Sequence, residues 1–393
     1  MIQKHEAPET VPSEPSFIVC RMYRTFTTLA RIQLWIVLIT FTTLLYFSAR
    51  LDQIYDNAVA SEVTVCGKKT GLSESIMDRI EERIRCRLTF AFPRNQPVIQ
   101  LQNDRRTFNL THDLSGAVGL GNFMFMTATT FGLAASSGRT PVFMEPHPHM
   151  AKFLHSFPVF DQKPPAGSIP KHRVEAAGIY ETSLPRKLAV NNTAAPVKRI
   201  ITLAGFLQSW RYFHHIRDEL FYRFVFKPSI YTQVTQELNT KLTKYMKDTN
   251  RSPRMIIGIH VRRGDLLDPI PHRYGHTVAT PRYLLRMTSR LNSQYPNSVF
   301  AVVSNDLPYC RTILRNLDNV LYMDGNNTAE VDLALLTLMD HLILSVGTFG
   351  WWGAYLSEAG EVYYYKHWPR RVTPMSREYK KTDYFFPTWI GAD

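Results

Sequence analysis

The sequence lacks several common functional signatures. Its four cysteines, Cys20, Cys66, Cys86 and Cys310, include no C-x-x-C pair, so the usual zinc spacings are absent. It contains no G-x-x-x-x-G-K-[ST] loop, and it has neither an RNP-like motif nor a basic repeat. These absences argue against a zinc module, a P-loop enzyme and a nucleic-acid-binding protein.

Acidic residues are also scarce. The 393-residue chain has 33 Asp and Glu against 46 Lys and Arg, which gives a formal net charge of +13. This excess is compatible with a solvated basic surface or with an anionic ligand or surface as partner. An apolar fraction of 45% and a length sufficient for two domains or one large one predict a folded chain with a sizeable core.

Charge is absent from residues 32–49, IQLWIVLITFTTLLYFSA, which Arg31 and Arg50 bracket. Such a run is close to the lower length limit for crossing a bilayer. A buried core helix or a cleaved signal peptide are the alternatives. A signal peptide would have its apolar region nearer the start and a small-residue cleavage site. We therefore expect an uncleaved transmembrane signal anchor.

The flanks of this run predict its orientation. Arg21, Arg24 and Arg31 precede it, whereas acidic residues follow soon after Arg50. We expect a cytosolic tail at 1–31, the anchor at 32–49 and a stem at 50–104, with the rest of the chain lumenal. We therefore expect a single-pass membrane protein in the type II orientation, located in the Golgi membrane.

Sequons agree with a lumenal location. N-x-[ST] occurs at Asn109, Asn191 and Asn326, all after the apolar run, and these are the expected glycosylation sites. A lumenal compartment permits disulfides. Cys66 and Cys86 are the pair suggested by proximity, which leaves Cys310 unpaired.

From about residue 105, segments typical of strands alternate with segments typical of helices. This alternation predicts an α/β fold with parallel sheet covered on both faces. The polar stretch KYMKDTNRSPR, near residues 245–253, is the best candidate for a domain boundary. We therefore expect two Rossmann-like halves facing a cleft, at 105–248 and 249–393.

Polar residues gather at three predicted strand ends in the second half. Parallel strands would bring these ends to one edge of the sheet, where open α/β sheets bind ligands. The three groups are His260, Arg262, Arg263 and Asp265 in HVRRGD; Ser304, Asn305 and Asp306 in SND; and Gly347, Thr348 and Phe349 in GTFG.

The paired arginines suggest a diphosphate site. A guanidinium binds phosphate with two hydrogen bonds, and a helix N-terminus beside it favours an anion. A surface turn with a local salt bridge is the alternative. No Asp-x-Asp pair is present to hold a metal on a diphosphate, as many sugar-nucleotide enzymes do. We therefore expect a metal-independent sugar-nucleotide transferase with no cofactor.

The same motifs carry a family resemblance. HVRRGD, SND and GTFGWWGAYL resemble the donor-half motifs of the α-1,2-fucosyltransferases, glycosyltransferase family eleven, and GLGNFMF and FLQSWRYF are similar to its first-half motifs. The resemblance runs from about residue 110 to the end. It implies an inverting transfer of fucose from GDP-fucose to the 2-hydroxyl of a galactose-like residue on a glycan.

The resemblance also implies roles for individual residues. Arg262 would hold the diphosphate with support from Arg263. The remaining implied donor contacts are His260 and Asp332 at the guanine end, Ser304, Asn305 and Asp306 along the nucleotide pocket, Gly347, Thr348 and Phe349 around the phosphates, and Gly121 and Asn122 from the first half.

Three matters stay open at this point. Asp265 is a candidate catalytic base, but it is equally a candidate partner for an arginine. Trp210, Arg211 and Tyr212 are candidates for shaping the acceptor site. A fucosyltransferase of another linkage or with a protein acceptor, and a non-catalytic glycan- or nucleotide-binding protein, are the rival functions.

Overall fold

The computed structural model describes residues 75–91, 109–112, 119–141, 157, 173–175, 181, 187–188 and 200–393. The chain divides into two compact units, 1–53 and 54–393, and every described residue belongs to the second. The expected tail and anchor therefore lie outside the described residues. Among the described residues, no helix combines the length and apolar character needed to cross a membrane.

The first sheet has four parallel strands in the order β2-β1-β4-β3. Helix α3, Leu120–Ser137, contacts β1 and β2 and is buried along most of its length. The strands are β1 (Asn109–His112), β2 (Thr140–Pro141), β3 (Arg173–Glu175) and β4 (Ile200–Ala204). After β4 come the short helices η2 (Trp210–Tyr212), η3 (His214–Ile216) and α6 (Arg217–Arg223).

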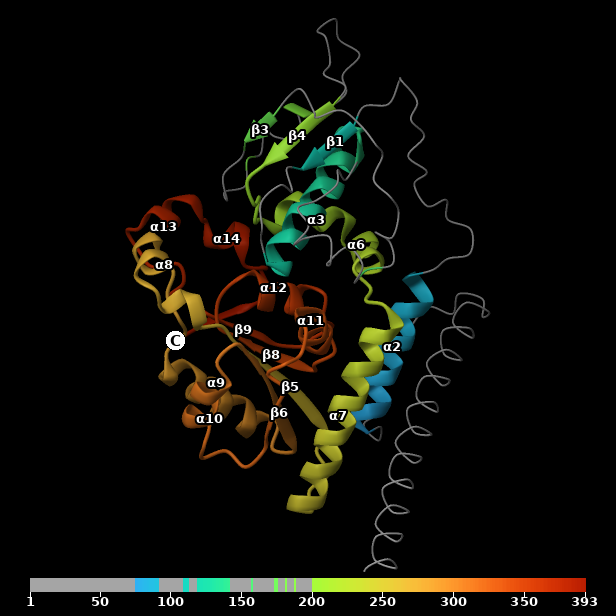
Figure 1. The fold of residues 1–393 in the computed structure, drawn as a ribbon, viewed down its shortest axis with the longest axis vertical. Helices are drawn as coiled ribbons and strands as arrows, with labels where there is room; N and C mark the ends of the chain where they lie inside the picture. The colour runs from blue at the N-terminus through green and yellow to red at the C-terminus, as the bar shows by residue number, and fades with distance from the viewer. Residues whose placement is uncertain are drawn as a thin grey trace, which may run out of the picture. The chain divides into compact units, whose positions relative to one another are not determined.

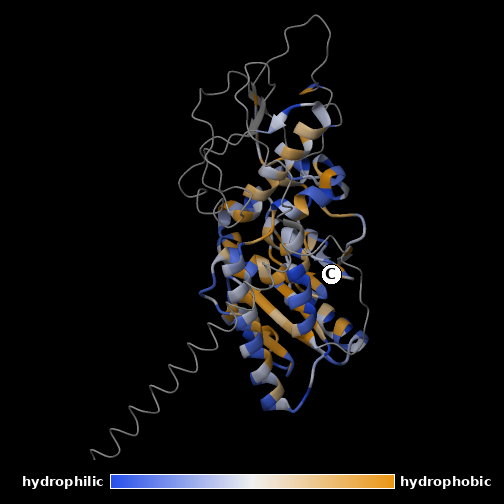
Figure 2. Cartoon of the chain, turned by 90° about the vertical axis from the view of Figure 1, so that its right-hand side faces the viewer, coloured by the Kyte–Doolittle hydropathy of each residue, from blue (hydrophilic) through white to orange (hydrophobic). Residues whose placement is uncertain are grey.

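The second sheet has six parallel strands in the order β10-β9-β8-β5-β6-β7. Its central strands are the most hydrophobic part of the fold, as Figure 2 shows. A parallel strand covered on both faces reads as an apolar run, and MIIGIHV is such a run. The strands are β5 (Met255–Val261), β6 (Ser298–Ser304), β7 (Val320–Tyr322), β8 (His341–Leu344), β9 (Val362–Tyr365) and β10 (Ile390–Ala392).

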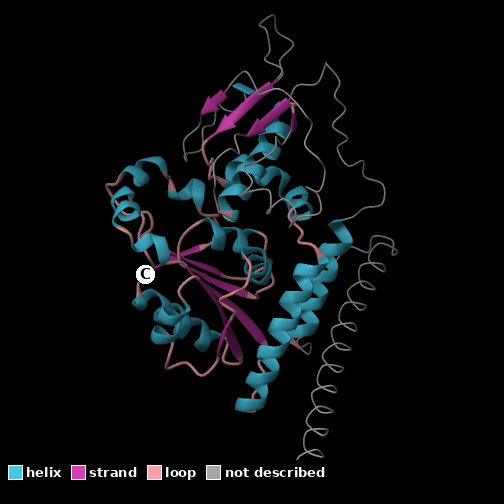
Figure 3. Cartoon of the chain, in the orientation of Figure 1, coloured by secondary structure: helices cyan, strands magenta, loops and turns pink. Residues whose placement is uncertain are grey.

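Helices flank the second sheet on both sides (Figures 1 and 3). Helices α9 and α10 lie on one side, and α7 and α11 lie on the other. The helices of this region are α7 (Pro228–Thr249), η4 (Gly264–Leu267), α8 (Pro269–Tyr274), α9 (Pro281–Gln294), α10 (Leu307–Ile313), α11 (Ala329–Thr337), α12 (Thr348–Tyr355), α13 (Pro374–Glu378) and α14 (Lys381–Tyr384). The predicted α/β alternation with parallel strands is confirmed.

Helix α2, Ile76–Ala91, was not expected, because it falls within the predicted stem. It packs against α7, and its buried face includes Ile80, Ile84 and Leu88. Arg79 and Arg83 both bond to the Asp340 carboxylate, at 3.0 and 2.5 Å. This part of the stem range is therefore integrated into the folded unit.

Helix α7 ends at Thr249, one residue after the expected division, and it packs against α11 and β7 of the second sheet. The N-terminal ends of α3 and α12 meet, which joins the helix of the first sheet to a helix of the second.

Candidate functional site

The ends of β5, β6 and β8 meet at one edge of the second sheet, as the sequence predicted. Val261 pairs with Ser304, and His260 pairs with Leu344, so the three following loops begin side by side. This edge carries all three polar groups that the sequence singled out.

Arg262 lies at the centre of this edge. Its backbone N–H donates to Ser345 Oγ at 2.8 Å, and its guanidinium Nη2 lies 2.6 Å from Asp265 Oδ1. A Cβ added to Gly347 would lie 3.7 Å from Arg262 Cδ, so the arginine side chain passes the start of α12. The guanidinium remains partly exposed, at 38% for the side chain, and is therefore accessible to a ligand.

Gly347 is the residue before the first turn of α12. Its φ of +91° is a conformation that glycine adopts readily and other residues rarely do. No side chain caps the N-terminus of α12, where backbone N–H groups lack helical partners and the helix dipole is positive. Arg262 and this helix end together form a site suited to a phosphate group.

Arg263 is held rigidly beside that site. Its backbone N–H donates to Asn305 Oδ1 and its Nε donates to Asp306 Oδ2, both at 2.9 Å. Its guanidinium also lies 3.6 Å from the centre of the Tyr309 ring, in a cation–π arrangement. These contacts occupy the side chain and fix the loop, which agrees with a supporting position next to Arg262.

The second loop is held together by hydrogen bonds to its own side chains, those of Ser304, Asn305 and Asp306. Ser304 Oγ accepts from the Asp306 N–H at 2.9 Å, and Asp306 Oδ1 accepts from the Tyr309 N–H at the start of α10. Gly264 has a φ of +44°, and a Cβ there would lie 2.5 Å from Asn305 Nδ2. The close approach of this glycine lets Asn305 reach the Arg263 backbone.

His260 is more enclosed than the sequence suggested. Its ring lies 5.4 Å from the Phe349 ring, and a Cβ on Gly350 would lie 2.4 Å from its Nδ1. Burial first, and then the charge on Arg262, lowers the pKa of His260 to about 3. A neutral, buried imidazole in this place supports Phe349 and α12, and it offers little surface to a nucleotide.

Asp332 lies in the first turn of α11. Asn327 Nδ2 donates to its carboxylate at 3.0 Å and to Glu237 at 2.8 Å. Burial is the main reason that the pKa of Asp332 rises to about 7, and Glu237 and Asp324 raise it further. The helix begins after Thr328, which makes no side-chain capping bond. The hydrogen bond from the Asn327 side chain is therefore what orients the Asp332 carboxylate.

Gly121 and Asn122 meet α12 directly. A Cβ on Gly121 would lie 2.7 Å from Phe349 N and 2.7 Å from Thr348 Oγ1. Asn122 Oδ1 accepts from Thr348 Oγ1 and from Gln208 Nε2, each at 2.9 Å. The two residues thus fix the junction between the sheets, beside the expected phosphate site.

The three candidate acceptor residues divide into two groups. Trp210 Nε1 donates to the Thr382 carbonyl at 3.2 Å, and Arg211 pairs with Asp383 at 2.8 Å, with both side chains partly accessible. Tyr212 is different, because it is 1% exposed and its hydroxyl accepts from the Glu181 N–H. The expectation that Tyr212 contacts an acceptor conflicts with this enclosure, and its position is that of a core residue.

Several other expected features are only partly within the described residues. Asn326 is exposed in the turn before α11, and Asn109 begins β1, whereas Asn191 lies outside the described residues. Cys86 is disulfide-bonded and Cys310 is free and buried. Cys66 lies outside the described residues, so the Cys66–Cys86 pairing stays a prediction. The described residues contain no group of three or more His, Cys, Asp or Glu arranged to hold a metal.

Sequence reasoning missed two residues of the site. The Ser345 hydroxyl accepts a hydrogen bond from the Arg262 backbone N–H. The Gln208 side chain donates to the side-chain oxygen of Asn122, which also accepts from Thr348. Ser345 follows β8 directly, so its place at a strand end was an available signal. Gln208 is the third residue of FLQSWRYF, a motif that the sequence analysis noted without assigning this side chain.

Comparison with known proteins adds independent evidence. The model of "Glycosyl transferase family 11" matches residues 192–393. Galactoside alpha-(1,2)-fucosyltransferase 2 of Sus scrofa is 30% identical over 284 residues, which cover 70% of this chain and 78% of that protein. Galactoside alpha-(1,2)-fucosyltransferase 1 of Sus scrofa is 32% identical over 200 residues, covering 49% of this chain and 53% of that protein.

Among solved structures, fucosyltransferase NodZ from Bradyrhizobium matches with a TM-score of 0.39 and 14% identity, over 64% of this chain and 94% of that one. The family match over 192–393 and the first relative, matched over 78% of its length, carry the assignment. The chain belongs to glycosyl transferase family 11.

Proposed function

We propose that this protein transfers fucose from GDP-fucose to the 2-hydroxyl of a galactose-like residue on a glycan, with inversion and without a metal. The observation that carries the proposal is the position of Arg262, whose side chain passes Gly347 at the uncapped N-terminus of α12. Relatives named galactoside alpha-(1,2)-fucosyltransferase support the transferred sugar, the acceptor class and the linkage.

The chemistry follows from this geometry. Breaking the bond between fucose and GDP leaves additional negative charge on the diphosphate. A guanidinium and a helix N-terminus aimed at that charge before the reaction stabilise the transition state more than the ground state. Asp265 keeps the Arg262 guanidinium in place through a 2.6 Å ion pair. Because of this ion pair, we propose that Asp265 orients Arg262 and does not act as the catalytic base.

The overall organisation is part of the same proposal. The residues near 105–248 and 249–393 would form an acceptor-side half and a GDP-fucose-binding half of GT-B type. Asp332 would receive the guanine, and Gly121 and Asn122, in the first turn of α3, would face the donor from the first half. Residues 32–49 would anchor the protein in the Golgi membrane with these halves in the lumen.

The test uses purified full-length protein, GDP-fucose, galactose-terminated and galactose-free acceptors, and a chelator. We expect an α-1,2-linked product on galactose-terminated acceptors. Replacing Arg262 by Ala should reduce kcat by about a hundredfold or more with the fold intact, as expected for loss of a transition-state contact. Arg251→Ala is the control, because Arg251 is an exposed arginine paired with Asp318 away from this edge. Normal turnover in Arg262→Ala, or dependence on a metal, would refute the mechanism.

A further inference from the structure

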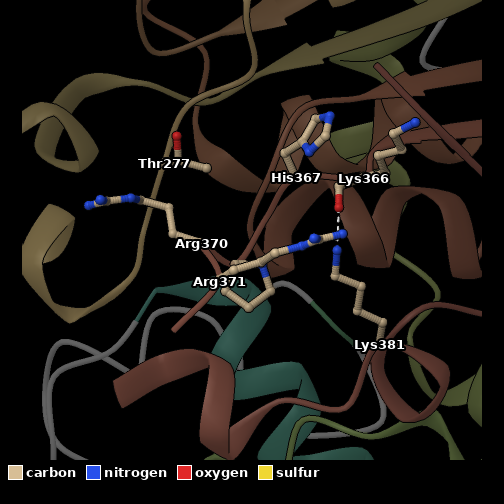
Figure 4. Close-up of a pocket in the computed structure, with 7 residues that line it drawn as sticks. Thr277, Lys366, His367, Arg370, Arg371 and Lys381 are labelled. Carbon is tan, nitrogen blue, oxygen red and sulfur yellow. Dashed lines mark hydrogen bonds between the residues drawn. The ribbon is translucent and has the colours of Figure 1, made fainter. Parts of the chain in front are cut away.

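A second basic region adjoins the site at the end of β9. It is a pocket of about 370 Å³ lined by Thr277, Lys366, His367, Pro369, Arg370, Arg371 and Lys381 (Figure 4). Lys366 and His367 directly follow β9, which is parallel to β8. The pocket therefore opens at the same edge of the second sheet as Arg262, two strands further along.

The charge of this pocket is only partly compensated. Its lining contains no Asp or Glu. Asp393 pairs with Lys366 at 3.1 Å and lies 3.8 Å from His367. In the described part of the chain, no carboxylate forms an ion pair with Arg371 or Lys381, and the Lys381 ammonium donates to the Lys366 carbonyl instead. Burial, followed by the charges on Arg371 and Lys366, lowers the pKa of Lys381.

The position of the pocket links it to both parts of the site. Arg370, in the lining, donates to the His272 carbonyl of α8 at 3.0 Å, and α8 contacts η4, the short helix that contains Asp265, the partner of Arg262. On the other side, Lys381 begins α14. The next two residues of that helix, Thr382 and Asp383, bond to Trp210 and Arg211. The pocket thus lies between the expected phosphate site and the expected acceptor residues.

The diphosphate of the donor does not need this pocket. Arg262 and the N-terminus of α12 already form a site for it, and they follow β5 and β8. A pocket of this volume accommodates a sugar-sized group, and clustered Lys and Arg side chains bind carboxylate or sulfate through charge-assisted hydrogen bonds. An anion here would be adjacent to the sugar that receives fucose.

We propose that this pocket binds an anionic group, a carboxylate or sulfate, on the acceptor glycan next to the galactose-like residue that is fucosylated. The inference rests on the proposed function and specifies its substrate class. It predicts that the enzyme prefers acidic acceptors over neutral ones of the same backbone, and that added salt reduces this preference because ions screen the attraction.

The experiment compares N-acetyllactosamine with the same disaccharide sulfated on its glucosamine unit. With the full-length protein, we expect the sulfated acceptor to have a KM lower by about tenfold, as expected for one charge-assisted contact. Arg371→Ala and Lys381→Ala should raise the KM of the sulfated acceptor toward that of the neutral one. They should leave the KM of GDP-fucose and the turnover of the neutral acceptor unchanged.

Lys380→Ala and Arg377→Ala are the matched controls, because they remove the same charge from exposed neighbours outside the pocket lining. Equal KM values for the two acceptors in wild type, or equal losses for both in the variants, would overturn the inference. A rise in the KM of GDP-fucose in the pocket variants would reassign the pocket to the donor.

A direct binding measurement separates this inference from the proposed function. If no acceptor is fucosylated, the function fails, but calorimetric titration of sulfated N-acetyllactosamine in the presence of GDP still tests the pocket. Binding that Arg371→Ala weakens and Lys380→Ala does not would support the site. Absence of binding, or binding unaffected by Arg371→Ala, would reject it.

Discussion

The hydroxyl of Thr348 donates a hydrogen bond of 2.9 Å to the side-chain oxygen of Asn122. The bond joins the first turn of α12 to the first turn of α3, and so joins the helices of the two sheets. Gly121 makes this contact possible, because its missing side chain leaves room for the Phe349 backbone. The geometry of the expected phosphate site therefore depends on residues from both sheets.

We predict that Gly121→Ala lowers kcat/KM by about tenfold to a hundredfold. The added methyl would lie 2.7 Å from backbone atoms of Thr348 and Phe349, so α12 must shift relative to Arg262. A misplacement on the order of 1 Å at a catalytic site is sufficient for a loss of this size. Steady-state kinetics and the thermal midpoint of both proteins would measure the effect.

Gly119→Ala is the matched control for this change. No heavy atom lies within 4 Å of a Cβ at Gly119, and its φ of −74° suits any residue. We expect only a small loss of helix stability, under about 1 kcal/mol, and near-normal activity. Equal kinetics for the two variants would show that the contact between α3 and α12 does not position the site.

Asp265→Asn should reduce kcat by less than about tenfold. The Asp265 carboxylate is exposed and forms an ion pair with Arg262, so its amide replacement loosens the arginine without removing it. Loss of a true general base typically costs about a hundredfold to ten-thousandfold. The discriminating measurement is the pH dependence of kcat, which should keep its shape in Asp265→Asn. Loss of the acidic limb, where the rate falls as a general base becomes protonated, together with a larger rate loss would identify Asp265 as the base.

The second sheet could be predicted from the sequence, because its central strands are formed by short runs of consecutive apolar residues. Strands β5 and β6 are buried on both faces and read as unbroken apolar runs. The carboxyl ends of parallel strands lie at one edge of a sheet, so the polar residues that follow these strands could be predicted to lie together. Trp351 and Trp352, in the same half of the chain, lie in the core, and both are less than 2% exposed.

The features that were missed depend on residues far apart in the chain. Helix α2 reads as a mixed-charge stem, because its arginines find their partner, Asp340, more than 250 residues later. Tyr212 follows two partly accessible residues, and no local pattern distinguishes its burial. The basic pocket combines Thr277, residues 366–371 and Lys381, which only the folded chain brings together.

Asp340 gives a prediction about stability and pH. Burial alone would raise its pKa, but Arg83, Arg79 and the Ile256 N–H outweigh burial and hold the pKa below its ordinary value of 3.8. The stability that this carboxylate contributes is therefore complete above about pH 5. It is lost as the pH falls below 3.8 and through the lower folded-state value.

Asp340→Ala should lower the free energy of unfolding by about 3–5 kcal/mol at pH 7, because it removes the buried carboxylate that pairs with Arg79 and Arg83. Denaturant titrations from pH 3 to pH 7 would measure this. Wild type should lose more stability than Asp340→Asn between pH 5 and pH 3. Parallel pH curves for the two proteins would show that α2 is not held through this carboxylate.

Asp332 gives a prediction about nucleotide binding and pH. Its pKa of about 7 means that the empty site is partly protonated at neutral pH. Guanine presents two adjacent N–H donors, and only an ionised carboxylate can accept from both with its two oxygens. Binding must then remove the proton, so the affinity for GDP should fall as the pH drops below 7, by up to tenfold per pH unit.

Calorimetric titration of GDP between pH 5.5 and pH 8 would test this dependence, with the variants Asp332→Asn and Glu330→Gln. The phosphates of GDP titrate near pH 6 as well, so the informative quantity is the difference between wild type and variant. Asp332→Asn should bind GDP about tenfold to a hundredfold more weakly at pH 8, as expected for loss of a charged hydrogen-bond acceptor, and should lose the extra pH dependence. Glu330→Gln removes a carboxylate from the same first turn of α11 and should keep both the affinity for GDP and its extra pH dependence. If Asp332→Asn binds GDP like wild type at every pH, the guanine is recognised elsewhere on the sheet edge.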